Sequence, residues 1–214
     1  MHHLSTFPHF ADIRRTFPEL GGILFDMDGT LFKTEEVHAE ALKSMAAHWR
    51  IRPPFPPEEI QERLKGMADH QVLELAKSWP GFPVDLDVRA FVEEKNRRVI
   101  ELLKTLPLAS WGAHQFKAFL AEAKREKLRL AIVTSSERAV TDALVEAAGL
   151  ASSFDLIITL QDVTHPKPHP APYLMAMERL GLAPSATLIF EDSAPGLAAA
   201  RASGAHAVEV SWWD

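Results

Sequence analysis

From residue 105 onward, short apolar segments alternate with amphipathic ones, and this alternation most limits the folds available to the chain. The apolar segments are rich in Ile, Leu and Val and have the length of strands: 128–133, 154–159, 186–190 and 205–210. The segments between them carry apolar residues at helical spacing: 113–127, 137–148, 172–180 and 195–202. Strands that are apolar along their whole length are buried on both faces. The sequence therefore predicts an α/β fold with a doubly wound parallel sheet.

Glycines mark the ends of three of these predicted helices. They occur in the sequences A-A-G-L, R-L-G-L and A-S-G-A, at Gly149, Gly181 and Gly204. Glycine tolerates the left-handed backbone conformation in which many helices end. The spacing of these glycines therefore supports the predicted alternation of helix and strand.

An earlier strand ends in two acids. Residues 23–30 read I-L-F-D-M-D-G-T, so Asp26 and Asp28 directly follow an apolar segment and precede a glycine turn. Like charges this close repel, and the folded protein must neutralise them with a cation, a proton or a basic partner. This pattern indicates a functional site rather than a core strand.

A calcium-binding loop is one alternative for these acids. If Gly29 is the loop glycine, Glu35 falls at the last ligand position. The first ligand position would then be Leu24, and a strand rather than a helix would precede the loop. Both features argue against this alternative.

Residues 35–105 have a different pattern from the rest of the chain. Helical periodicity occurs in four segments, without a convincing strand among them: 37–49, 58–64, 69–79 and 87–106. A proline-rich turn, R-P-P-F-P-P, separates the first two. We predict two domains: an α/β core formed by residues 1–34 and 106–214, and an all-helical domain over residues 35–105, with 107–112 as a hinge.

Composition excludes several classes of protein. The chain has no cysteine, which rules out disulfides, thiolate metal sites and a cysteine nucleophile. Its formal net charge of -6 disfavours nonspecific binding of nucleic acid. No apolar run approaches the roughly 20 residues of a membrane span, and the first residues lack the pattern of a signal peptide. We expect a soluble cytoplasmic protein, without nucleic-acid or membrane partners, and a monomer because the chain can bury its own core.

Polar residues follow the predicted strands at the ends where ligands bind in open parallel sheets. They form four sets: Asp26 and Asp28; Thr134, Ser135 and Ser136; Lys167; and Glu191 and Asp192. Carboxylate oxygens suit Mg²⁺, and amides with a hydroxyl at a helix start suit a phosphate. A lysine can balance the remaining negative charge. The sequence therefore predicts a site for a divalent cation and a phosphate.

Each set also has a purely structural interpretation. Residues 134–136 can cap the next helix, and we expect Ser136 to be its N-cap. Glu191 and Asp192 can interact with a helix dipole. A lysine between prolines, as in H-P-K-P-H-P, is typically a surface residue. The functional interpretation is favoured because all four sets occur in one predicted sheet.

The motifs D-M-D-G-T-L-F, V-T-S-S, P-K-P and F-E-D-S-A-P-G, in this order, resemble those of the haloacid dehalogenase superfamily of phosphotransferases. The helical insertion after the first motif resembles the subgroup with a helical cap. The likeness is greatest to the branch of β-phosphoglucomutase and sugar-phosphate phosphatases, and it extends from Gly22 to Val210. It implies a Rossmann-like core and a cap formed by the helical domain.

This resemblance implies roles for the matching residues. Asp26 would be the nucleophile that forms an aspartyl-phosphate, and Asp28 the general acid and then base. Lys167 would contact both the phosphate and the nucleophile. Dehalogenation is disfavoured, because the dehalogenases of the superfamily lack the second aspartate.

The resemblance also implies ligands for the cation and the phosphate. Mg²⁺ would bind Asp26, the backbone carbonyl of Asp28 and Asp192, with Glu191 as an outer or partial ligand. The hydroxyl of Thr134 and the amide of Ser135 would hold phosphate oxygens.

In the helical domain, three residues match less specific features. His38 lies where the mutase branch has a histidine that helps gate the acid/base aspartate, although it could be a helix-surface histidine. Lys65 and Gly66, in R-L-K-G-M, resemble the substrate-specificity loop of the cap.

We expect a Mg²⁺-dependent phosphatase acting on a small phosphorylated metabolite, a sugar phosphate. One alternative is a phosphomutase of the β-phosphoglucomutase type, whose cap has an arginine shortly after its K-G pair. Here that position is near Asp69, although Arg63 or Arg97 could serve instead. A noncatalytic phosphometabolite-binding protein is a further alternative, and nucleotide or pyrophosphate substrates remain open. Trp212 and Trp213 are expected to mark packing or a contact surface.

Overall fold

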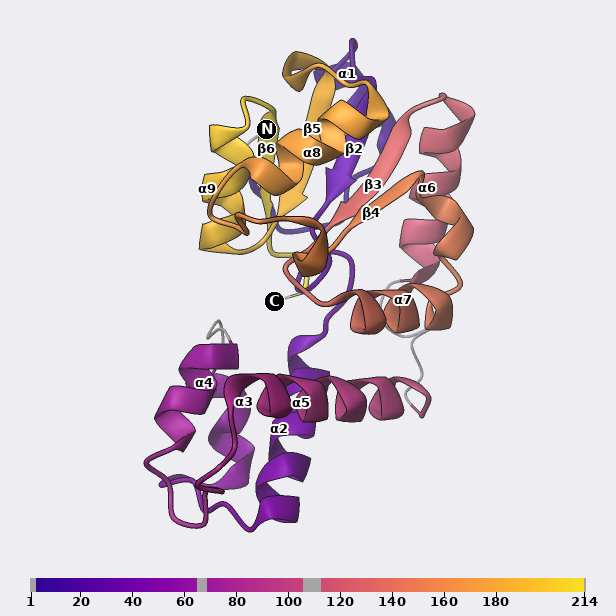
Figure 1. Cartoon of the computed structure of the whole chain (residues 1–214). Helices are drawn as coiled ribbons and strands as arrows, with labels where there is room; N and C mark the ends of the chain where they lie inside the picture. Colours follow the sequence, from indigo (N-terminus) through magenta and orange to yellow (C-terminus); the bar gives the residue numbers. More distant parts are fainter. Residues whose placement is uncertain (1–2, 65–68, 106–112, 214) are drawn as a thin grey trace. The chain divides into compact units, whose positions relative to one another are not determined.

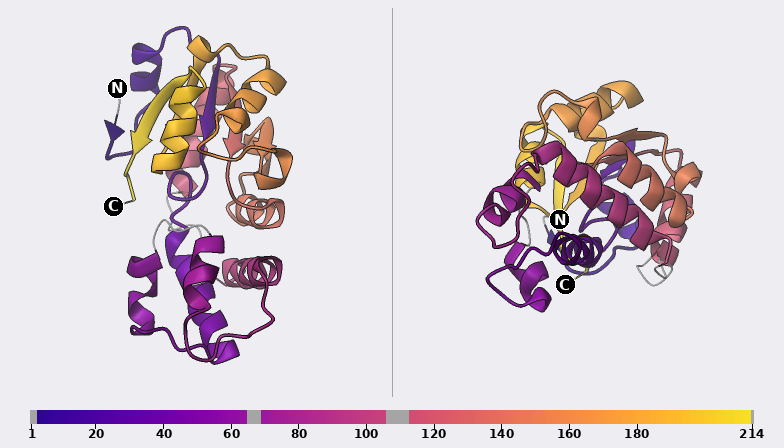
Figure 2. Two further views of the ribbon diagram at one scale, coloured as in Figure 1. Left: turned by 60° about the vertical axis from the view of Figure 1, so that its left-hand side comes forward. Right: turned by 60° about the horizontal axis from the view of Figure 1, so that its bottom comes forward.

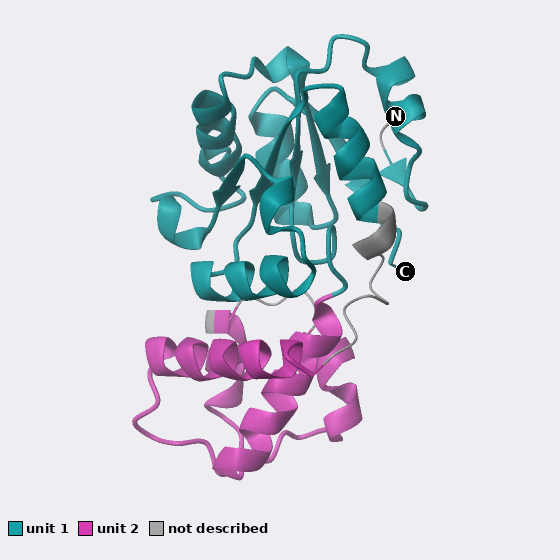
Figure 3. Cartoon of the chain, turned by 90° about the vertical axis from the view of Figure 1, so that its right-hand side faces the viewer, with its two compact units in different colours: residues 1–33, 107–214 teal, residues 34–106 magenta. Residues whose placement is uncertain are grey.

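The computed structural model describes residues 3–64, 69–105 and 113–213 (Figure 1). The chain divides into two compact units, one formed by residues 1–33 and 107–214 and the other by residues 34–106 (Figure 3). Among the described residues, no helix has the length and apolar character needed to cross a membrane.

The first unit is built on a six-stranded parallel sheet. Its strands are β1 (His3–Leu4), β2 (Gly22–Phe25), β3 (Arg129–Val133), β4 (Leu156–Ile158), β5 (Thr187–Glu191) and β6 (His206–Val210). Their order in the sheet is β1-β6-β5-β2-β3-β4. The predicted α/β fold with a parallel sheet is confirmed.

Helices cover both faces of this sheet. They are α1 (Phe10–Thr16), α6 (Ala113–Arg125), α7 (Arg138–Ala147), α8 (Ala171–Leu180) and α9 (Ala194–Ala202). Short 3-10 turns precede β4, follow β4 and precede β5: η3 (Ala151–Ser153), η4 (Leu160–Asp162) and η5 (Pro184–Ala186). Glycines with positive φ follow α7, α8 and α9, as the sequence predicts.

The alternation of side chains along the strands divides the core into two layers. On one face, Leu24 and Ile189 pack in a buried cluster with residues of α8 and α9, which lie side by side (Figure 2). On the other face, the rings of Phe25 and Phe190 lie 6.3 and 6.5 Å from the ring of Phe119 on α6. This double burial explains why the strands are apolar along their whole length.

The first 20 residues contain two elements that the sequence analysis did not predict. Strand β1 pairs with β6 through only two residues, His3 and Leu4, which is too short for a recognisable pattern. Helix α1 buries Phe10 and Ile13. Such short elements are specified by tertiary packing rather than by local periodicity.

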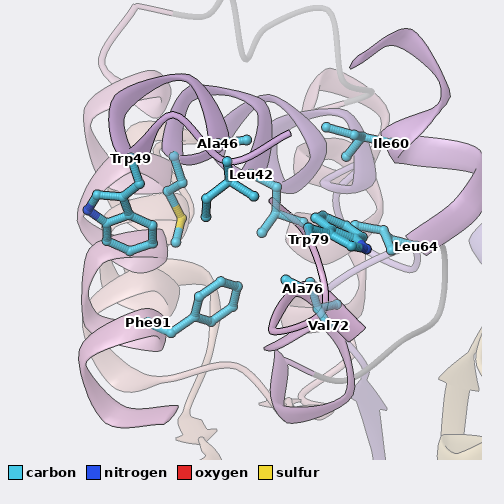
Figure 4. A pocket seen from close by; sticks show the side chains of 11 residues that line it. Leu42, Ala46, Trp49, Ile60, Leu64, Val72, Ala76, Trp79 and Phe91 are labelled. Carbon is cyan, nitrogen blue, oxygen red and sulfur yellow. The ribbon is translucent and has the colours of Figure 1, made fainter. Parts of the chain in front are cut away.

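The second unit contains helices and turns among its described residues. They are α2 (Glu35–Trp49), η1 (Pro57–Glu59), α3 (Ile60–Leu64), α4 (Asp69–Ala76) and α5 (Val88–Leu103). Its apolar interior, where Leu42, Trp49, Trp79 and Phe91 meet, encloses a cavity of about 20 Å³ (Figure 4). That volume is enough for about one water molecule, so we interpret it as a packing gap in the core.

Candidate active site

The sheet register brings the predicted site residues to one edge. Phe25 of β2 pairs with Ile132 of β3 and with Phe190 of β5. The next residues along these three strands are therefore neighbours, and they include Asp26 and Glu191. The backbone N–H of Asp26 donates to the carbonyl of Phe190 at 3.0 Å, which fixes the start of the Asp26 loop against β5.

The side chain of Lys167 connects three of these segments. Its Nζ donates to Asp26 Oδ1 at 2.6 Å, to Glu191 Oε1 at 2.5 Å and to the carbonyl of Val133 at 2.8 Å. An ammonium group has three N–H donors, so these acceptors use all of them. Only 4% of the side chain is exposed, which makes the lysine a buried cross-link rather than a surface residue.

The carboxylates keep Lys167 charged despite its burial. Burial alone lowers the pKa of the ammonium group, but the negative charges of Asp26 and Glu191 outweigh that effect and raise the pKa above its ordinary value of 10.5.

Glu191 is fully buried and surrounded by donors. Its Oε1 accepts from Lys167 and from the hydroxyl of Tyr173, at 2.8 Å for the latter. Its Oε2 accepts from the backbone N–H of Ser193 at 3.2 Å and from the hydroxyl of Ser193 at 3.0 Å. Two bonds on each oxygen fill its lone pairs. Glu191 is therefore better placed to orient Lys167 than to bind a cation directly.

Helix α9 begins against the carboxylate of Glu191. Ser193 is its N-cap, and its hydroxyl accepts from the N–H of Gly196. A Cβ atom on Gly196 would lie 1.8 Å from Glu191 Oε1. The glycine of the F-E-D-S-A-P-G motif therefore allows the helix to approach the buried acid.

Asp28 is held from the loop after β3. The hydroxyl of Ser136 donates to Asp28 Oδ2, and the hydroxyl of Thr134 lies 3.5 Å from the same oxygen. Thr134 is itself oriented by the N–H of Ser136, which donates to its hydroxyl at 2.9 Å. The prediction that Ser136 is an N-cap is wrong: the N-cap of α7 is Glu137, and the hydroxyl of Ser136 is directed to Asp28 instead.

Asp192 lies against the glycine turn that follows Asp28. The hydroxyl of Thr30 donates to Asp192 Oδ1 at 3.0 Å. Gly29 has a φ of +79°, and a Cβ atom there would lie 2.1 Å from Asp192 Oδ2. The turn therefore requires glycine both for its backbone conformation and for the approach of the carboxylate.

Three carboxylates form a candidate metal centre. Asp26, Glu191 and Asp192 each offer an oxygen, and these oxygens lie within 4.8 Å of one another. Burial, and next the charge of Glu191, raise the pKa of Asp26 well above its ordinary value of 3.8. A divalent cation would relieve this repulsion, and carboxylate oxygens are suitable ligands for it. With Glu191 saturated by other donors, Asp26 and Asp192 are the best-placed carboxylates.

The structure thus brings together most of the residues that the sequence identifies. They are Asp26, Asp28, Thr134, Lys167, Glu191 and Asp192, with Ser135 next to Thr134 and exposed. His38 lies near the start of α2 in the helical unit. Lys65 and Gly66 lie outside the described residues.

Tyr173 is the main residue of this site that the sequence analysis missed. Its side chain is fully buried, and its hydroxyl donates to Glu191. The ammonium of Lys167 lies 4.9 Å from the centre of its ring, a geometry in which the ring attracts the cation. The available signal was that the only tyrosine of the chain lies six residues after Lys167.

Comparison with known proteins identifies relatives over nearly the whole chain. The profile of a family described as haloacid dehalogenase-like hydrolase matches residues 23–210. Protein CbbY of Rhodobacter capsulatus is 33% identical over 194 residues, which cover 89% of this chain and 85% of the relative. The fructose-1-phosphate phosphatase YqaB of Escherichia coli is 29% identical over 202 residues, which cover 91% of this chain and 98% of the relative.

A solved structure supports the same relationship. The crystal structure of a CbbY variant from Rhodobacter sphaeroides, in complex with xylulose-(1,5)bisphosphate, has a TM-score of 0.73 and 29% sequence identity. The match covers 89% of this chain and 85% of that one.

The requirement for glycine at position 29 can be tested with a matched pair of variants. Gly29 and Gly181 both have positive φ, but a Cβ atom at Gly181 would have no atom within 4 Å. We expect Gly181→Ala to lower the free energy of unfolding by about 1 kcal/mol, the cost of a left-handed alanine. Gly29→Ala must also displace the carboxylate of Asp192, so it should weaken Mg²⁺ binding at least 10-fold by calorimetric titration. Wild-type Mg²⁺ affinity in Gly29→Ala would contradict this geometry.

The raised pKa of Asp26 predicts how the effect of Mg²⁺ depends on pH. Between 3.8 and its raised pKa, the metal-free folded protein binds more protons than the unfolded chain. Its free energy of unfolding should therefore fall as pH rises through that window. Lys167 stays protonated in both states there and adds no slope. Since a cation bound here would require ionised Asp26, the increase in Tm caused by Mg²⁺ should grow as the pH rises through that window.

The control for this measurement is Asp26→Asn, whose amide does not titrate. Its Tm difference between Mg²⁺ and chelator should be small and should change little with pH. An equally large, pH-independent Mg²⁺ effect in both proteins would contradict the assignment of Asp26 to the metal centre.

Proposed function

The chain belongs to the haloacid dehalogenase-like hydrolase family, and we propose on this premise that it is a Mg²⁺-dependent phosphatase of a small sugar phosphate. Its relatives include phosphatases, among them the phosphorylated carbohydrates phosphatase of Thermotoga maritima, 30% identical over 189 residues that cover 85% of this chain and 81% of the relative. The chain is a phosphoric monoester hydrolase of this family, and the sugar-phosphate substrate is the proposed part.

The observation that carries the proposal is the contact of Lys167 with Asp26 and Glu191. It places a buried cation on Oδ1 of the proposed nucleophile and orients that carboxylate at the carboxyl end of β2. In the first step, a carboxylate oxygen of Asp26 attacks phosphorus while the bond from phosphorus to the leaving oxygen breaks. Asp28 donates a proton to that oxygen as it departs.

The second step releases phosphate. Asp28, now a carboxylate, takes a proton from water, and the water oxygen attacks the phosphorus of the aspartyl-phosphate. The bond from phosphorus to Asp26 breaks, which restores the carboxylate and yields inorganic phosphate. The contacts of Ser136 and Thr134 with Asp28 Oδ2 hold this acid/base group in place.

The remaining site residues stabilise the transferred group. The hydroxyl of Thr134 and the amide of Ser135 are the proposed donors to the phosphoryl oxygens. The ammonium of Lys167 would supply positive charge beside them, and it would contact a phosphoryl oxygen only by giving up one of its present acceptors. Asp26 and Asp192, with the backbone carbonyl of Asp28, would hold Mg²⁺. Glu191 would not coordinate the cation directly. When bound, the cation supplies positive charge that offsets the charge developing on those oxygens.

Ion pairs within the helical unit already engage the residues considered for a mutase's second phosphate. Asp69 is paired with the buried Lys95, whose Nζ lies 2.5 and 2.6 Å from its two carboxylate oxygens. Arg63 forms a hydrogen-bonded ion pair with Glu59, and Arg97 forms such pairs with Glu94 and Glu101. A second phosphate bound by these arginines would have to displace those acids. The role of this unit as a cap, with His38, Lys65 and Gly66 near the substrate, stays a prediction.

The proposed activity predicts phosphate release that depends on Mg²⁺ and on Asp26. We expect turnover of one or more members of a panel of sugar phosphates, phosphoglycolate, nucleotides and pyrophosphate, and its loss in chelator. Asp26→Asn should lower the rate at least about 1,000-fold because an amide is a poor nucleophile. A wild-type circular dichroism spectrum would exclude misfolding. Conversion of β-glucose 1-phosphate to glucose 6-phosphate on addition of a sugar bisphosphate activator, without release of inorganic phosphate from any substrate, would indicate a mutase instead.

The acid role of Asp28 predicts a dependence on the leaving group. A phenolate such as p-nitrophenolate departs without a proton, whereas a sugar alkoxide needs one. Asp28→Asn should therefore reduce kcat/KM about 10-fold more for a sugar phosphate than for p-nitrophenyl phosphate. Equal losses on the two substrates would contradict the proposed role.

A further inference from the structure

Two tryptophans at the end of the described chain donate to one atom of the Asp26 loop. The indole N–H groups of Trp212 and Trp213 lie 2.8 and 3.0 Å from the backbone carbonyl oxygen of Thr30. A carbonyl oxygen has two lone pairs, so this pair of donors can satisfy both. The contact joins segments separated by 182 and 183 positions in the sequence.

Thr30 connects that loop to Asp192. It is fully buried, and its hydroxyl holds Asp192, one of the best-placed carboxylates of the metal centre. It lies two residues after Asp28, in a turn where the N–H groups of Leu31 and Phe32 donate to the carbonyl of Met27. A displacement of Thr30 would therefore affect both Asp28 and Asp192.

The indoles are themselves fixed by the core. The ring of Trp212 lies 5.2 Å from Phe7, 5.9 Å from Phe116 and 5.7 Å from Phe190, the residue before Glu191. The ring of Trp213 lies 6.0 Å from Phe116. The backbone N–H of Ser211 donates to the carbonyl of Leu4, which attaches this segment to β1. The donors thus belong to a packed aromatic cluster.

We propose that Trp212 and Trp213 are positioning residues. They hold the carbonyl of Thr30 and so fix the Asp26 loop (residues 26–32), which carries Asp28, and with it Asp192 in the active site. The catalytic part of this proposal rests on the proposed function. A partly buried indole needs an acceptor in any case, and phenylalanine would pack in such a cluster equally well. What distinguishes the pair is that both donors converge on the loop that carries Asp28.

The test replaces both donors and keeps both rings. In the metal-free Trp212→Phe/Trp213→Phe variant, the amides of Gly29, Leu31 and Phe32 should exchange with deuterium about 10-fold faster than in the wild type. A factor of ten corresponds to a contribution of roughly 1.4 kcal/mol from the two lost bonds together. Exchange of the β3 and β5 amides should be unchanged. Each single variant keeps one donor and should show a smaller increase.

A second readout separates positioning from packing. With Mg²⁺, the double variant should lose roughly 10-fold in kcat with little change in KM, and bind Mg²⁺ less tightly in calorimetry. The control is Phe10→Leu, which alters the same side of the sheet through Phe119 at 5.5 Å and removes no hydrogen-bond donor, because the side chain of Phe10 has none. It should lower Tm but leave the exchange of the loop amides and kcat at wild-type values.

Wild-type exchange of the loop amides in the double variant, with only a lower Tm, would overturn the proposal. So would an equal increase of exchange in Phe10→Leu. The exchange measurement uses no substrate, and so it tests the positioning role even if the panel of phosphate esters reveals no phosphatase activity.

Discussion

The arrangement of the site depends on the buried ammonium of Lys167. It contacts Asp26, Glu191 and the end of β3 at once, and thereby joins three segments of the sheet edge. Four carboxyl groups, those of Asp26, Asp28, Glu191 and Asp192, meet there, so this one positive charge leaves an excess of negative charge. Burial, and next that excess of negative charge, raise the pKa of Asp26, and the excess makes the site suitable for a divalent cation.

Several residues around Lys167 support the arrangement of the acids. Tyr173 and Ser193 donate hydrogen bonds to the oxygens of Glu191, and these bonds hold its carboxylate in contact with Lys167. Gly196 and Gly29 allow a helix and a turn to approach the acids closely. None of these supporting residues is proposed to bind the substrate, yet they position the residues that would.

The main architecture and the central residues could be predicted from the sequence because both leave local patterns. Apolar strands and glycine-terminated helices predict the parallel sheet, and the four motifs predict the family, which the match over residues 23–210 confirms. Ser136, Tyr173 and the tryptophan pair could not be assigned in this way, because their contacts join residues 18 to 183 positions apart. A hydroxyl before a helix reads equally well as an N-cap, and only the folded structure shows that Ser136 is directed to Asp28.

In the proposed mechanism, Asp26 carries the phosphoryl group during turnover. This role can be tested by mixing Asp28→Asn with p-nitrophenyl phosphate and Mg²⁺, quenching in acid and mapping peptides by mass spectrometry. Because this substrate needs no acid for its first step while the second step lacks its base, the intermediate should accumulate. We predict one phosphoryl group on Asp26, absent in chelator. Release of p-nitrophenolate with no phosphoryl group on the enzyme, or with one on another residue, would contradict the account.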